Sequence, residues 1–213
     1  VVEAHEAMQA ETGRLGTVLS GGSLACRSTS FRHGEIGAFL LHKHWEVEAD
    51  DCMIERRGKL PSGKPALTTA ARKWSAGQRL APSRLKVDAA SKRLVALEFS
   101  SDPFVISAWR ELSANQGFLD TVCGLIADTG LAEQVGFAIF DRASIKMAEG
   151  EQFVEENADN QSILSARCLT RNEEEIVIRT GWAFHSAAAD EPTIASCIAY
   201  CMSAGSSPHC KHH

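Results

Sequence analysis

The sequence predicts an α+β domain, with a largely antiparallel sheet and a central helical block at about residues 102–130. Strand-like segments lie on both sides of this block, and strands and helices do not alternate regularly as a doubly wound parallel fold requires. A chain of 213 residues with 44% apolar and 23% charged side chains suits one compact core. We therefore expect a single domain over residues 1–213, with a Cys/His-rich C-terminal tail at about 197–213.

The helical block has the clearest local signals. Asp102 is a favourable N-cap and Pro103 a favourable first helical residue, and apolar residues follow at helical spacing up to Leu112. A second helix is predicted from 118 to 126, with Gly130 as its stop. The opening stretch, 1–12, is also predicted to be a short helix.

Strands are predicted on both sides of the block, from the alternation and β-branched content of their residues. Residues 88–92 join two of these strands and predict a hairpin loop, and residues 60–65 predict an exposed connection or a lid. The predicted strands are 36–47, 52–56, 85–87, 94–99, 135–140, 163–169 and 175–184.

Charge and hydropathy restrict the partners. The net charge is −5, from 27 acidic and 22 basic side chains, which argues against nucleic acid, since binding phosphates needs a concentrated basic surface. No apolar run approaches the roughly 18–20 residues of a membrane-spanning helix, so we expect no membrane partner. Seven cysteines, an odd number, leave at least one thiol unpaired within the chain. With no visible secretion signal, this favours a reducing, cytoplasmic location, although the chain begins at Val1.

The most chemistry-like feature is a strand segment with two histidines. Alternation along a strand divides residues 38–48 between two faces. One face carries the apolar residues Phe39, Leu41, Trp45 and Val47, with Lys43 the exception, and looks like core. The other begins apolar and then becomes polar, with the row His42, His44, Glu46 and Glu48.

Two imidazoles at i and i+2 on a strand project in parallel and suit a divalent transition metal such as Zn or Fe. Glu48 or Glu46 would complete the site or orient an imidazole, and His185 is a candidate third histidine ligand. Without metal, His42, His44 and Glu46 are candidates for acid–base catalysis near neutral pH. The alternative reading is an exposed row without special chemistry, in which His185 caps a strand.

His42-x-His44, followed after three residues by Glu48, resembles the first metal-binding motif of cupins over about twenty residues. The resemblance implies a metal site at these side chains. The glycine spacing departs from that pattern, because Gly37 lies too near His42 and Gly58 too far beyond Glu48.

The C-terminus concentrates cysteine and histidine. Cys197 and Cys201 at i and i+4 would share one helix face, and Cys210 lies among three histidines at 209, 212 and 213. A structural metal site, a disulfide, adventitious metal binding and a plain tail all fit this composition.

These observations favour a small-molecule enzyme with a His/Glu-lined pocket. The chemistry would be either metal-dependent, through Lewis acid or activated water, or acid–base chemistry of the isomerase, cyclase or lyase type. The alternative is a non-catalytic binding or interaction protein. The expected partner is a small molecule, and a homo-oligomer is compatible with the sequence.

Overall fold

The fold is a curled, mixed β-sheet that closes on itself. The computed structural model describes residues 36–41, 47–139, 145–158, 161–174, 177–183 and 196–202. The strands are β1 Ile36–Leu40, β2 Asp51–Lys59, β3 Pro65–Lys73, β4 Ala81–Asp88, β5 Arg93–Ser100, β6 Val135–Ile139, β7 Gln152–Ala158, β8 Gln161–Arg167, β9 Val177–Ala183 and β10 Ser196–Met202. The helices are α2 Pro103–Ala114, α3 Gln116–Asp128 and the single turn α4 Arg171–Glu174.

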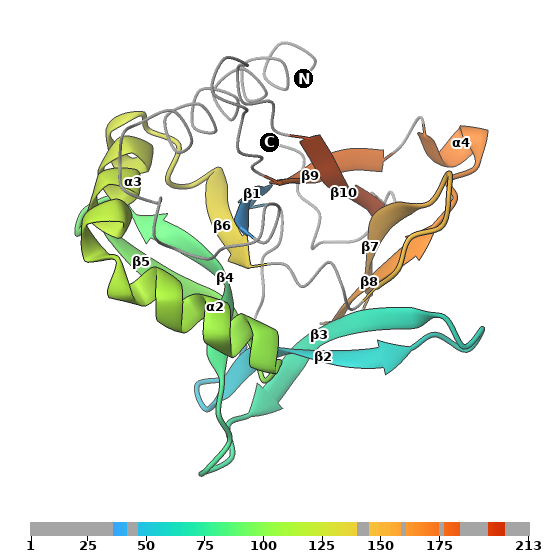
Figure 1. Cartoon of the computed structure of the whole chain (residues 1–213), viewed down its shortest axis with the longest axis horizontal. Helices are drawn as coiled ribbons and strands as arrows, with labels where there is room; N and C mark the ends of the chain where they lie inside the picture. The colour runs from blue at the N-terminus through green and yellow to red at the C-terminus, as the bar shows by residue number, and fades with distance from the viewer. Residues whose placement is uncertain are drawn as a thin grey trace.

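The strands form a ring in the order β1-β6-β4-β5-β2-β3-β8-β7-β10-β9, and β1 also pairs with β9 to close it. The β2–β5 and β7–β10 pairs are parallel, and the other pairs that the structure describes are antiparallel. The predicted α+β class with a central helical block is therefore wrong. The sheet is the body of the molecule, and helices α2 and α3 lie on one side of it (Figure 1).

Helices α2 and α3 cover the outside of β4, β5 and β6 (Figure 1). Local signals set their ends as predicted. The Asp102 side chain accepts a hydrogen bond from the Phe104 N–H at 2.8 Å, and Gly130 ends α3 with φ of +75°. Their apolar faces pack in two clusters against the outward-facing side chains of the sheet, with Val105, Leu112, Val122 and Ile126 from the helices against Ala81, Leu85, Val87, Phe137 and Ile139 from β4 and β6.

Several strand predictions need correction. Residues 65–73 and 152–158 form strands that the sequence did not predict. Cys197 and Cys201 lie in strand β10, so the predicted helix face is wrong there. The predicted hairpin at 88–92 is confirmed, and the Asp88 carboxylate accepts from both the backbone N–H and the hydroxyl of Ser91 at 2.7 Å. The predicted opening helix, 1–12, lies outside the described residues.

No helix in the described ranges combines the length and the apolar character needed to cross a membrane.

Gly136 on β6 permits a close approach inside the ring. A Cβ at this position would lie 2.4 Å from the Leu85 carbonyl oxygen and 2.7 Å from Cε1 of Phe39. Phe39 is 5% exposed and pairs in register with Gly136. The missing side chain therefore makes room for the Phe39 ring beside β4.

We predict that Gly136→Ala destabilises the protein by about 1–3 kcal/mol, since the contact with the Leu85 carbonyl is to backbone and cannot relax by a rotamer change. The control is Gly124→Ala in α3, where a Cβ meets nothing within 4 Å. It should stabilise by about 0.5–1 kcal/mol. Chemical denaturation measures both, and equal effects would contradict the packing described here.

Candidate functional site

The strongest polar feature is an ion pair that crosses the inside of the ring. The Arg84 guanidinium on β4 donates to both carboxylate oxygens of Glu155 on β7, at 3.1 and 3.4 Å. These strands lie five steps apart in the ring in either direction. A direct contact between strands placed opposite each other passes through the interior, so both side chains point inward.

Paired β-bulges flank Arg84. The register passes from Pro82↔Phe99 to Arg84↔Glu98 and then to Leu85↔Ala96. Each strand thus carries one extra residue, Ser83 on β4 and Leu97 on β5. Bulges redirect side chains and are frequent beside functional sites. Here they let Arg84 and Glu98 face inward while Leu85, Val87 and Leu94 of the same strands pack outward against the helices.

Inside the ring, Arg84 has two further neighbours, and Glu155 has one. Its Nε lies 3.4 Å from a Glu98 carboxylate oxygen, and its guanidinium carbon lies 5.2 Å from the centre of the Phe39 ring. Ser162 on β8 donates its hydroxyl to Glu155 at 2.6 Å. Arg84 is 7% exposed, and Glu98 and Glu155 are each 2% exposed. The result is a hydrogen-bonded charge network in a site that excludes water.

Two opposing effects act on the pKa of Arg84. Burial by itself would lower this pKa, because it penalises the charged form. The negative charges of Glu155, Glu98 and Glu55, in that order, outweigh burial and raise the pKa above its ordinary value. Arg84 is therefore a permanent cation inside the ring.

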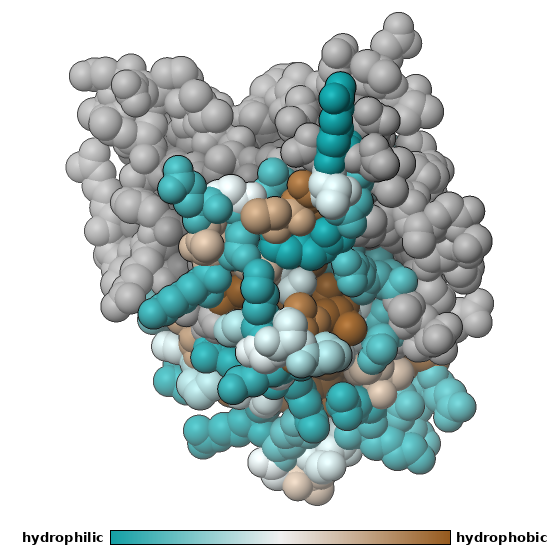
Figure 2. Space-filling view, turned by 90° about the vertical axis from the view of Figure 1, so that its right-hand side faces the viewer, coloured by the Kyte–Doolittle hydropathy of each residue, from teal (hydrophilic) through white to brown (hydrophobic). Residues whose placement is uncertain are grey.

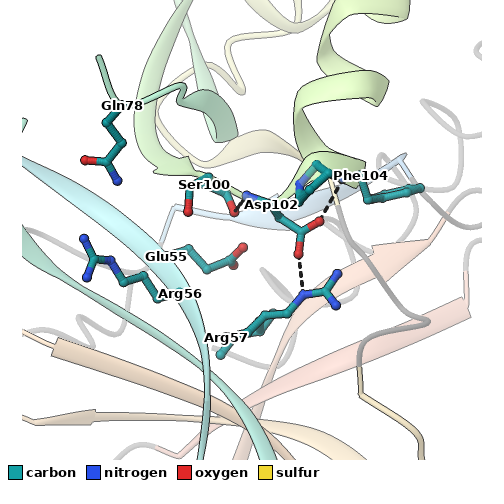
Figure 3. A pocket seen from close by; sticks show the side chains of 10 residues that line it. Glu55, Arg56, Arg57, Gln78, Ser100, Asp102 and Phe104 are labelled. Carbon is teal, nitrogen blue, oxygen red and sulfur yellow. Dashed lines mark hydrogen bonds and ion pairs between the residues drawn. The ribbon is translucent and has the colours of Figure 1, made fainter. Parts of the chain in front are cut away.

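A pocket of about 750 Å³ opens beside this network. Glu55 on β2 lines the pocket, and its charge is one of those that raise the pKa of Arg84. It pairs in register with Ser100, two residues from Glu98 along β5. In Figure 3, Glu55 lies between the Arg57–Asp102 pair and the side on which Arg56 and Gln78 are found. The lining comes from β2, β3, the turn before β4, the end of β5 and the start of α2, as Glu55, Arg56, Arg57, Leu67, Gln78, Ser100, Ser101, Asp102, Pro103 and Phe104.

One rim of the pocket is fixed by Asp102. One oxygen of its carboxylate caps α2 at the Phe104 N–H, and the other accepts a hydrogen bond from Nε of Arg57. The Asp102 backbone N–H donates to the Ser100 hydroxyl at 3.2 Å. This ties β2, the end of β5 and the start of α2 together around the pocket.

Apolar side chains adjoin the polar network. Phe153 and Leu164 lie on the same face of β7 and β8 as Glu155, and Ile145 packs with them. Leu67 packs against this cluster and also lines the pocket. Figure 2 shows the side on which β7 and β8 lie, with a largely hydrophilic described surface and hydrophobic residues visible in a recess. The pocket thus joins charged groups to an apolar wall, as small-molecule sites do.

Of the sequence-predicted site residues, the structure describes only Glu48. His42, His44, Glu46 and His185 fall outside the described residues, so their arrangement stays a prediction. Glu48 is exposed at the turn before β2, where its carbonyl oxygen accepts the Asp51 N–H at 2.9 Å. Strand β1 ends at Leu40, before the two histidines.

Within the described ranges, no group of three or more His, Cys, Asp or Glu side chains is arranged to hold a metal ion. Cys52, Cys123 and Cys168 are free thiols. Burial raises the pKa of the Cys123 thiol, and the charge of Asp120 raises it further by a smaller amount. Cys123 lies on the buried face of α3.

Sequence reasoning missed Glu55, Arg84, Glu98 and Glu155. Each is a charged residue inside a strand, and Glu98 stands in the apolar run Leu97-Glu98-Phe99. A single carboxylate in such a run is a usable signal, because strands bury charges only where those charges are paired.

Comparison with family models, with curated proteins and with solved structures found no match to this chain. Function therefore has to be argued from the chemistry of the site.

We predict that Arg84→Met lowers the free energy of unfolding by about 3–5 kcal/mol at neutral pH, because it leaves two buried carboxylates without their shared cation. Chemical denaturation at neutral pH measures the effect.

Two further variants separate this network from general effects on β4. Lys86→Met removes a partly exposed cation that lies 3.9 Å from Glu133, and should change stability by less than about 0.5 kcal/mol. Adding Glu155→Gln to Arg84→Met should recover part of the loss. A neutral effect of Arg84→Met alone at pH 7 would contradict a closed, buried network.

Proposed function

We propose that this protein is a small-molecule enzyme that works by proton transfer in the pocket at Glu55. One observation carries the proposal: the Arg84–Glu155 ion pair crosses the inside of the ring and is linked through Glu55 to an open pocket. A buried charge costs several kcal/mol to remove from water. Placing such charges at a pocket supports a catalytic role for them.

Glu55 is the proposed proton acceptor or donor. It is the one acid that both lines the pocket and acts on Arg84. In this role Arg84 would be a positioning residue, holding the carboxylates of the network in place while Glu55 meets the ligand. Carboxylate proton transfer is the chemistry of isomerases, cyclases and lyases.

The proposal also includes the two histidines, His42 and His44. His42 follows Phe39 by three residues, and Phe39 packs on the Arg84 guanidinium. We propose His42, His44 and Glu46 as partners in proton transfer, or His42, His44, Glu48 and His185 as ligands of Zn or Fe. Elemental analysis of a variant whose histidines at 209, 212 and 213 are alanine separates the two forms. Stoichiometric metal supports the second form, and its absence removes it.

The pocket volume is within the range of roughly 300–1,000 Å³ usual for small ligands. Leu67, Pro103 and Phe104 supply an apolar wall, and Glu55, Gln78 and Ser101 supply polar atoms. This mixture suits a small amphipathic organic molecule better than a flat protein surface, which supports the enzyme over the interaction protein.

We predict that fragment screening by protein-observed NMR finds ligands that shift the backbone signals of Gln78, Ser101 and Phe104. Glu55→Gln should weaken those that hydrogen-bond the carboxylate by about tenfold, since hydrogen bonds to charged groups contribute about 1.5–3 kcal/mol.

The matched control is Glu149→Gln, an exposed carboxylate outside the pocket lining, which should leave affinity unchanged. Thermal unfolding of both variants confirms that they fold. Ligands that bind only elsewhere, or that ignore Glu55→Gln, would count against the proposal.

A further inference from the structure

The charge balance of the pocket identifies its ligand class. The lining holds two guanidinium groups and two carboxylates, namely Arg56, Arg57, Glu55 and Asp102. Arg57 is committed to Asp102 by an ion pair. Glu55 acts on the buried Arg84. Arg56 is therefore the lining guanidinium that is left to contact a ligand.

Arg56 is exposed on β2 and forms no ion pair or side-chain hydrogen bond with any residue of the described ranges. In Figure 3 its side chain lies on the same side of Glu55 as Gln78. The guanidinium and amide groups of these two side chains are hydrogen-bond donors, and the hydroxyl of the pocket-lining Ser101 is a further donor. On this side of Glu55, Arg56 and Gln78 therefore offer donors and one positive charge.

Building on the function proposed above, we infer that the ligand is a small organic carboxylate. Its carboxylate is held by Arg56 and Gln78, its body lies against Leu67 and Phe104, and its reacting carbon faces Glu55. A planar guanidinium matches a carboxylate with two parallel hydrogen bonds.

The same balance disfavours a phosphate monoester, which carries close to two negative charges near neutral pH. Arg57 is already neutralised by Asp102, so a single guanidinium would face the second charge. The carboxylate of Glu55, also in the lining, would repel a dianion more strongly than a monoanion. A monoanion is therefore the better match.

The test measures binding of matched probes to the full chain by NMR titration at constant ionic strength. The carboxylates are propionate, lactate and benzoate, the uncharged probes are their amides, and phenyl phosphate is the dianion. At least one carboxylate should bind at Gln78 and Ser101 about tenfold or more tighter than its amide, and benzoate should bind tighter than phenyl phosphate.

Arg56→Gln should remove the preference for carboxylate over amide, and Arg56→Lys should restore only part of it, because an ammonium keeps the charge but loses the two-bond geometry. The control is Lys59→Gln, which removes the same charge from an exposed position on the same strand outside the lining. It should leave the preference intact.

Carboxylates that do not bind, or that bind no tighter than their amides, would overturn the inference. So would carboxylate affinity that survives Arg56→Gln, or tighter binding of phenyl phosphate. If the amides bind in the pocket and depend on Glu55 while the carboxylates do not, the ligand class is wrong and the proposed function stands. If no probe of either kind binds in the pocket, the inference of a carboxylate ligand is overturned. The proposed function is then tested by the fragment screen described under the proposed function.

Discussion

The ion pair between Arg84 and Glu155 is the interaction on which the inside of this molecule depends. It joins strands that lie opposite each other in the ring, and both side chains are almost fully buried. Removing these charges from water is costly, so the surrounding structure has to compensate them. Glu98, the Ser162 hydroxyl and the face of Phe39 do so. Gly136 makes the room that Phe39 needs.

Closing the sheet brings distant parts of the sequence into one site. Glu55 and Glu155 are a hundred residues apart in the sequence, yet both act on Arg84. Helices α2 and α3 lie outside this interior. They bury the outer face of β4, β5 and β6, and the first residues of α2 form a rim of the pocket through Asp102. Helices α2 and α3 thus stabilise the ring from outside and shape the opening of the pocket. The buried charged side chains lie inside the ring.

Local signals predicted α2, α3 and the hairpin at 88–92, because caps, a proline, a glycine and a turn aspartate act over a few residues. Closure was not predictable in this way, since the β1–β9 contact joins residues 37–39 to 181–183. The bulges at Ser83 and Leu97 also break the alternation from which inward and outward faces are read. Arg84 and Glu98 were therefore not predicted as site residues. The regular alternation at His42 and His44 instead predicted a site in a segment whose role stays a prediction.

The central claim is that the Arg84 guanidinium lies inside the ring and is coupled to the pocket. Arginine side-chain ¹⁵N NMR tests this most directly. We expect Arg84 Nε–H and Nη–H signals that exchange slowly with solvent and shift when a ligand binds beside Glu55. Rapid exchange like that of an exposed arginine, or Arg84 signals unmoved by any ligand in the pocket, would contradict it.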